Sequence, residues 1–417
     1  MKLRSIFASM CGNIIEWYDY ALFAYLAPIL AHQYFPKGSN YTSLLSVFAV
    51  FAAGFMMRPL GAIIFGYLGD KLGRAKTLKI TMLLISLPSL GMAFLPTYHY
   101  WGVLATTILV VFRLFQGLCI GGEFAGSIVY LTEIADDKRR GLTSSTTNNG
   151  SNFGLLLALG LSVFLAHLLS EDTFYEIGWR ICFFVGGVIG LMGLWLRSYL
   201  IESKVFLEAQ ENLQNRRPLR FLLAYQKKEM LKISLLIIIT AGGNYTLMAY
   251  FTTYLHTIIN LPIAESMRIQ ASLLILSIII IPFMAILSDK IGRRVMIIIS
   301  AIGYITFSIP CFFLLQNLHS IVSMLPLLLF YCCEQGTIPA TIVENFPFTS
   351  RYTGISLAYN MTMALVGGTA PMINTFLIHY FKNPIMPAAY MSICASISLL
   401  VVLFGLRTEY GVNCVLS

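Results

Sequence analysis

Long runs of apolar residues recur along the whole chain and are separated by short polar stretches. A helix needs about 20 predominantly apolar residues to cross a hydrocarbon core of about 30 Å. The runs lack the regular alternation of membrane-barrel strands, so helices are the arrangement that satisfies the backbone in lipid. The pattern predicts an all-α integral membrane protein whose twelve transmembrane helices lie near residues 9–35, 44–69, 77–95, 101–131, 143–169, 178–198, 232–258, 268–288, 295–315, 320–344, 353–381 and 385–406.

The polar loops show an internal repeat. Leu68–Arg74 and Leu287–Arg293 share the pattern Leu-x-Asp-Lys-x-Gly-Arg at an offset of 219 residues, and Gln116-Gly117 and Gln335-Gly336 have the same offset. An offset shared by separate motifs indicates duplication of a multi-helix unit, an arrangement common in transporters. We therefore expect two six-helix bundles and a cytoplasmic linker, at residues 1–198, 232–417 and 199–231 respectively.

The composition of the chain indicates a membrane environment, and the distribution of its positive charges predicts its orientation across the membrane. Of the residues, 57% are hydrophobic and only 11% are charged, which a soluble surface does not allow. Lys and Arg gather in alternate polar stretches, and positive residues near helix ends stay on the cytoplasmic side, so both termini are expected in the cytoplasm. The net charge of +9 then reflects topology, with a weak attraction to anionic lipid, and we expect no nucleic-acid partner.

Charged residues inside the predicted spans are the main candidates for a functional site, because each is costly in lipid unless it faces a cavity or a partner. They are Glu16, Asp19, Arg58, Arg113 and Glu123, all in the first half. If both arginines pair with acids, one acid is left to take and release a proton. We favour Glu16 or Asp19 for this role, because their helix also presents polar and aromatic residues on one face. The alternative is a static network that locks helix packing.

Neutral polar and aromatic residues in the same spans are candidates for binding a solute. Aromatic faces attract ammonium groups, and amides bond polar groups across helices. The candidates are Asn13, Trp17, Tyr20, Gln116, Asn149, Asn244, Tyr245 and Asn360.

Several familiar chemistries have no support in the sequence. There is no Walker-type phosphate loop, nucleophile elbow or His-Glu-x-x-His helix, so neither ATP coupling nor an enzyme activity is expected. The eight cysteines show no Cys-x-x-Cys spacing and the six histidines are scattered. We therefore expect no metal site and no cofactor.

Several motifs together resemble a known family. The loop Gly66–Arg74 and its repeat resemble the loop between helices 2 and 3 of the major facilitator superfamily, and Arg113-x-x-Gln116-Gly117 resembles its helix 4 signature. Further stretches resemble, more narrowly, the metabolite:proton symporter family, and among them are Gly12–Asp19, Arg58–Gly61, Gly121–Glu123 and Arg351–Asn360.

The resemblance implies the major facilitator fold, alternating access and inward uptake of a small polar metabolite with protons. Gly121–Glu123 and Met386–Tyr390 look closer to proline/betaine members than to members that carry citrate, α-ketoglutarate or shikimate. The resemblance also implies a bacterial inner-membrane protein, which we expect to function as a monomer. The gating loops that it implies contain Gly66, Asp70, Lys71, Gly73 and Arg74, and then Asp289, Lys290, Gly292 and Arg293.

The sequence departs from the family's pattern in two places, and other classes of function stay open. Trp179-Arg180 is followed by Ile181-Cys182, where the family commonly has Ile-Pro. The long C-terminal extension of osmosensing members has no counterpart in the given sequence. An organic-acid symporter, a passive facilitator or channel, and a sensor that binds without transport remain alternatives.

Overall fold

The structure is a computed structural model that describes residues 2–36, 39–72, 74–121, 123–197, 226–318, 320–346 and 351–405. Within these residues the secondary structure is helical and contains no strand. We refer to the described residues 2–197 and 226–405 as the N-terminal and C-terminal halves. Most of the predicted linker lies outside the described residues.

Each predicted span corresponds to one helix or to a series of consecutive helices. In the N-terminal half these are α1 (Lys2–Tyr25), α2 (Ala27–Tyr34), α3 (Asn40–Met56), α4 (Arg58–Leu72), α5 (Arg74–Phe94), α6 (Tyr98–Trp101), α7 (Val103–Ile120), α8 (Glu123–Ile134), η1 (Asp137–Arg139), α9 (Arg140–Leu168), α10 (Glu171–Thr173), η2 (Phe174–Gly178) and α11 (Trp179–Arg197). In the C-terminal half they are α14 (Lys227–Leu236), α15 (Ile238–Asn244), η3 (Tyr245–Tyr250), α16 (Phe251–Thr257), α17 (Ile263–Ile291), α18 (Arg293–Leu318), η4 (Ile321–Met324), α19 (Leu325–Glu344), α20 (Arg351–Thr362), η6 (Met363–Gly367), α21 (Ala370–Phe381) and α22 (Met386–Phe404).

Ten of the helical stretches in the described residues are long and apolar enough to cross a membrane. The other two predicted spans correspond to α1 with α2, which carries two buried acids, and to α5, whose apolar part is Ile80–Phe94. The predicted all-α membrane architecture is thus confirmed.

Two of the breaks in the spans have a cause that is visible in the sequence. The first span is interrupted at Leu26, just before Pro28, and the second at Met57, just before Pro59. Proline lacks the N–H that would continue the helical ladder, and it fits best in the first turn of a new helix. Further along, η3 and η6 are π-helical segments, a local widening that is frequent at functional sites.

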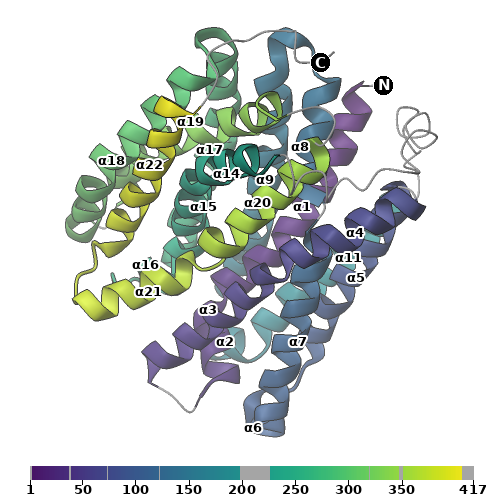
Figure 1. The fold of residues 1–417 in the computed structure, drawn as a ribbon. Coiled ribbons are helices and arrows are strands. Elements are labelled where there is room, and N and C mark those ends of the chain that lie inside the picture. Colours follow the sequence, from purple (N-terminus) through teal and green to yellow (C-terminus); the bar gives the residue numbers. More distant parts are fainter. Residues whose placement is uncertain are drawn as a thin grey trace.

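The two halves lie side by side, with the early helices on one side of the molecule and the green and yellow helices on the other (Figure 1). Helices pack mainly within their own half, as α1 does on α9 and α18 on α22. The broadest contact between the halves joins α9 to α17.

Glycines allow the backbone of α7 to lie directly against α3 and α4. A Cβ atom on Gly117 would lie 1.8 Å from the carbonyl oxygen of Gly54, and one on Gly61 would lie 1.7 Å from that of Leu118. No side chain fits at these distances, so the close helix packing that small residues permit in membranes is required here.

Candidate functional site

Asp19 is the centre of a buried polar network in the N-terminal half. Its carboxylate on α1 is 3% exposed. The hydroxyl of Ser89 on α5 donates a hydrogen bond to Oδ1, and Nε2 of Gln116 on α7 donates to Oδ2 over 2.5 Å. Gln116 Nε2 also lies 2.9 Å from Ser89 Oγ. Three helices therefore converge on one carboxylate.

Arg113 joins this network through Gln116. One turn before Gln116 on α7, its Nη1 donates to Gln116 Oε1 over 2.8 Å. The guanidinium carbon lies 4.0 Å from the centre of the Phe23 ring and 4.8 Å from that of Tyr20. Aromatic faces stabilise a buried cation, and no direct ion pair between Arg113 and an acid is found among the described residues.

Arg58 forms a second charged group at the boundary between the halves. Its Nη2 lies 3.8 Å from Oε1 of Glu16. Its Nε donates over 3.1 Å to Oδ1 of Asn360 on α20, in the other half. Asn360 Nδ2 in turn donates to the carbonyl of Gly121. Arg58 and Glu16 are 1% and 3% exposed, so this ion pair is buried at the interface between the halves.

An aromatic cluster surrounds this pair. The Trp17 ring lies 6.0 Å from both Phe124 and Tyr245, measured between ring centres. Phe55 lies 5.1 Å from Tyr245 and 5.0 Å from the Arg58 guanidinium. Tyr245 is the first residue of η3, so a π-helical segment of the C-terminal half brings an aromatic ring against α1 and α3.

The cluster also includes two further contacts. Tyr359 of α20 stacks on Phe124 with ring centres 4.7 Å apart, and Tyr20 packs edge-on against Phe55 at 4.8 Å. We call Trp17, Tyr20, Phe55, Phe124, Tyr245 and Tyr359 the aromatic cluster.

The remaining predicted binding residues lie elsewhere. Asn13 donates to Ser127 Oγ over 3.0 Å, within the N-terminal half. Asn149 on α9 donates over 3.3 Å to the carbonyl of Ile278 on α17. Asn244 accepts a hydrogen bond of 2.9 Å from the hydroxyl of Tyr331. The structure thus brings together Trp17, Tyr20, Tyr245 and Asn360 around Arg58, and Gln116 with Asp19, whereas Glu123 lies outside the described side chains.

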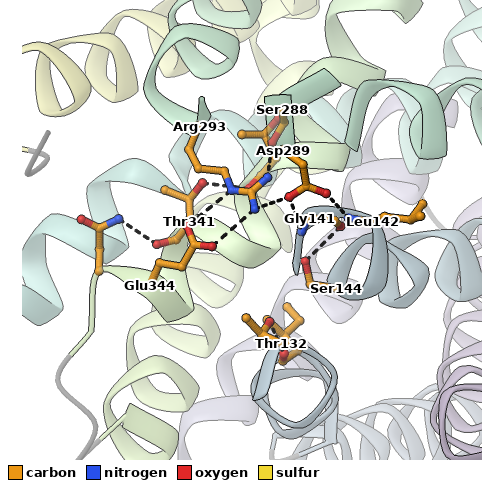
Figure 2. Close-up of polar contacts among 12 residues, drawn as sticks. Thr132, Gly141, Leu142, Ser144, Ser288, Asp289, Arg293, Thr341 and Glu344 are labelled. Carbon is orange, nitrogen blue, oxygen red and sulfur yellow. Dashed lines mark hydrogen bonds and ion pairs between the residues drawn. The ribbon is translucent and has the colours of Figure 1, made fainter. Parts of the chain in front are cut away.

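The second of the predicted gating loops joins the halves (Figure 2). Asp289, near the end of α17, accepts hydrogen bonds from the backbone N–H groups of Gly141 (2.9 Å) and Leu142 (3.1 Å) at the start of α9. A carboxylate at a helix N-terminus satisfies free N–H groups and faces the positive end of the helix dipole.

Arg293 holds the Asp289 carboxylate in place. Its Nη2 lies 2.6 Å from Oδ1 of Asp289 and 3.4 Å from Oε1 of Glu344 on α19. Gly292 has φ +100°, a conformation that favours glycine and turns the chain between α17 and α18. Lys290 is exposed. The side chains of the gating residues predicted in the first loop, Gly66, Asp70, Lys71, Gly73 and Arg74, lie outside the described residues.

The two halves also meet at the opposite end of the helices. Tyr41 at the start of α3 stacks on His379 of α21, with ring centres 3.8 Å apart. The halves are therefore in contact at both ends, as in an occluded arrangement.

One functional candidate was missed in the sequence. The expectation that all charged residues inside the predicted spans lie in the first half was wrong. Glu334 on α19 is fully buried and accepts a hydrogen bond from Thr240 of α15. It lies within the predicted span 320–344, so a complete count of acids in that span would have found it.

Comparison with known proteins agrees with this fold. The family model of the Major Facilitator Superfamily matches residues 9–371. The chain is 30% identical over 413 residues to a "Proline/betaine transporter" of Salmonella typhimurium, covering 96% of this chain and 82% of the relative. It is also 30% identical to the "Glycine betaine/proline/ectoine/pipecolic acid transporter OusA" of Dickeya dadantii, covering 97% and 83%.

Among solved structures, the proton:xylose symporter XylE superposes with a TM-score of 0.76 at 17% identity, covering 97% of this chain and 94% of XylE. The chain belongs to the major facilitator superfamily. It is a multi-pass membrane transporter of small molecules and not an enzyme, which confirms the resemblance found in the sequence.

Proposed function

We propose that this transporter couples the inward movement of a proline- or betaine-type zwitterion to the inward movement of protons. The observation that carries the proposal is the buried pair of Arg58 and Glu16 beside the aromatic cluster, at the boundary between the halves. Relatives named as proline/betaine transporters, at 30% identity over most of the chain, support the same class of substrate.

The site has the chemistry that a zwitterion requires. The substrate carboxylate would bind the guanidinium of Arg58, since charge-assisted hydrogen bonds to arginine are strong and directional. The substrate ammonium would lie against aromatic faces such as Trp17 and Tyr245, which attract cations through their ring quadrupoles. Arg113 also touches the cluster at Tyr20, but its Nη1 donates to Gln116 of the Asp19 network. Arg58 lies against Phe55 at the boundary between the halves, and one arginine there favours one carboxylate over a dianion.

Asp19 is the group that we propose to carry the coupled proton. It is buried, and its neighbours Ser89 and Gln116 are neutral donors. Arg113 is connected to it through Gln116. Loss of the Asp19 charge on protonation therefore changes the hydrogen bonds of a network that spans three helices, without leaving a cation directly unpaired.

Alternating access requires the two halves to separate at one end at a time. We propose that the N-terminal and C-terminal six-helix bundles are the moving bodies and that Asp289 closes the cytoplasmic end through the N-terminus of α9. We further propose an inner-membrane location with both termini cytoplasmic, and activity as a monomer. Labelling of single introduced cysteines in intact cells tests the orientation, and size determination in detergent tests the oligomeric state.

Uptake into proteoliposomes tests the transport proposal. Labelled proline, glycine betaine, citrate and α-ketoglutarate would be offered with and without an imposed inward proton gradient. We expect accumulation of proline or glycine betaine only with the gradient. Accumulation of an organic acid instead would support the organic-acid alternative, and equilibration without accumulation would indicate a facilitator.

A further inference from the structure

Glu334 occupies a buried polar site in the C-terminal half that the proposed mechanism does not use. The carboxylate is 0% exposed. The hydroxyl of Thr240 on α15 donates to its Oε1, and Nε2 of the adjacent Gln335 lies 3.4 Å from its Oε2. A buried acid of this kind is costly in a membrane and marks a functional site by default.

This arrangement matches the Asp19 site of the other half. Gln335 is the repeat counterpart of Gln116, at the offset of 219 residues. In both halves the side-chain amide of this glutamine lies beside a buried carboxylate, and in both a hydroxyl from another helix donates to the same carboxylate. The acid comes from α1 in one half and from α19 in the other. The same three groups, a carboxylate, a glutamine amide and a hydroxyl, therefore meet in both halves, although the acids do not occupy equivalent positions in the repeat.

The two sites differ in one charge. In the N-terminal half, Arg113 lies three residues before Gln116 and donates to it. The corresponding position before Gln335 is Cys332. Among the residues that the structure describes, no Lys, Arg or His forms an ion pair with Glu334.

Within the described part of the chain, the titratable groups that face Glu334 from the surrounding helices do not supply a cation either. They are Tyr304 of α18, Tyr331, Cys332 and Cys333 of α19, and Tyr359 of α20. These groups are neutral or, when ionised, negative. Burying a carboxylate without a cation is costly, and a proton bound to Glu334 would remove that cost.

The site also lies next to the surface along which the halves meet. The carbonyl of Gln335 accepts a hydrogen bond of 2.8 Å from Nδ2 of Asn148 on α9. Separation of the halves would break this bond and bring water towards Glu334. An acid that is dry in one arrangement and near water in another can hold a proton in the first and release it in the second.

We propose that Glu334 is a second proton-binding carboxyl, so that each half contributes one acid whose proton moves during the transport cycle. This inference rests on the proton coupling proposed above. It predicts that transport couples to one proton more than Asp19 alone would provide.

The test compares the wild-type transporter with Glu334→Gln in proteoliposomes, at a membrane potential held at zero. Steady-state accumulation of labelled glycine betaine would be measured against the imposed pH difference. For each coupled proton, a difference of one pH unit supports roughly a tenfold concentration ratio. We therefore expect the ratio at one pH unit to fall on the order of tenfold in Glu334→Gln, while Thr240→Ser, which keeps the hydroxyl, retains the wild-type ratio.

An equal dependence on pH in wild type and Glu334→Gln would overturn the inference. If the wild type itself fails to accumulate the solute, the proposed coupling fails, and infrared spectroscopy of the purified full chain then decides on Glu334. A carboxylic C=O band that titrates in the wild type and is missing from Glu334→Gln supports a protonated acid at this site. The same band in both proteins contradicts it.

Discussion

The side-chain amide of Gln116 lies between the carboxylate of Asp19 and the guanidinium of Arg113. Its Nε2 is 2.5 Å from Oδ2 of Asp19, and its Oε1 is 2.8 Å from Nη1 of Arg113. The acid and the base are therefore joined through a neutral group that can donate to one and accept from the other. Such a link stabilises both charges and still allows the acid to become neutral.

Asp19→Asn should separate proton coupling from substrate movement. The amide mimics the neutral acid but cannot release a proton. We therefore expect gradient-driven accumulation to fall by roughly tenfold or more at a difference of one pH unit, while exchange of internal for external solute continues. Uptake and counterflow in proteoliposomes measure the two properties. Ser89→Ala is the matched control, because it removes one donor and keeps the carboxylate. Undiminished accumulation in Asp19→Asn would rule out this acid as the coupling group.

Trp17→Leu should weaken binding of a quaternary ammonium. Loss of one cation–π contact costs about 0.5–2 kcal/mol, which corresponds to roughly a 2- to 30-fold increase in KM. The concentration dependence of glycine betaine uptake measures this change. Trp101→Leu is the control, because that ring is 49% exposed at the end of α6, away from the aromatic cluster. Equal KM values in the two variants would show that Trp17 does not contribute to substrate binding.

Asp289→Asn should loosen the contact between α17 and α9. Hydrogen bonds to a charged group contribute about 1.5–3 kcal/mol, and the substitution removes the charge that faces the N-terminus of α9. We expect the amides of Gly141 and Leu142 to exchange hydrogen for deuterium faster than in the wild type. Lys290→Gln changes an exposed neighbour and should leave this exchange unchanged. Wild-type protection in Asp289→Asn would mean that other contacts hold this end closed.

Gly117→Ala should prevent normal folding, because the added Cβ would lie 1.8 Å from the carbonyl oxygen of Gly54. We expect a large loss of folded protein in size-exclusion chromatography and a lower Tm. Gly160→Ala in helix α9 is the matched control, since no group packed against that position lies within 4 Å of the added Cβ. Alanine favours a helix over glycine by about 1 kcal/mol, so this variant should be at least as stable as the wild type.

The fold was largely predictable because membrane helices are specified locally. Twenty apolar residues define a span without reference to any other part of the chain, and Pro28 and Pro59 mark the breaks at Leu26 and Met57. The π-helical segment that begins at Tyr245 has no comparable local signal, and the Tyr245 ring packs against Trp17 and Phe55 of the opposite half.

The sequence predicted the charged residues of the site, but only some of the residues that contact them. Arg58 and Asp19 stand out because charge is rare in lipid. Ser89 does not, because serine is common in membrane helices and its role depends on which helices converge on Asp19. The cross-half bond between Arg58 and Asn360 joins residues 302 positions apart, a distance in sequence that no local pattern can bridge.

The glycine contacts between α7 and its neighbours have a mechanical consequence. Where Gly117 meets Gly54 and Gly61 meets Leu118, backbone touches backbone with no compressible layer of side chains between them. A displacement applied at one end of these helices would reach the other end almost undamped. We therefore expect α3, α4 and α7 to move as one rigid body. Conformational change during the transport cycle would then occur mainly at the side-chain contacts along the boundary between the halves.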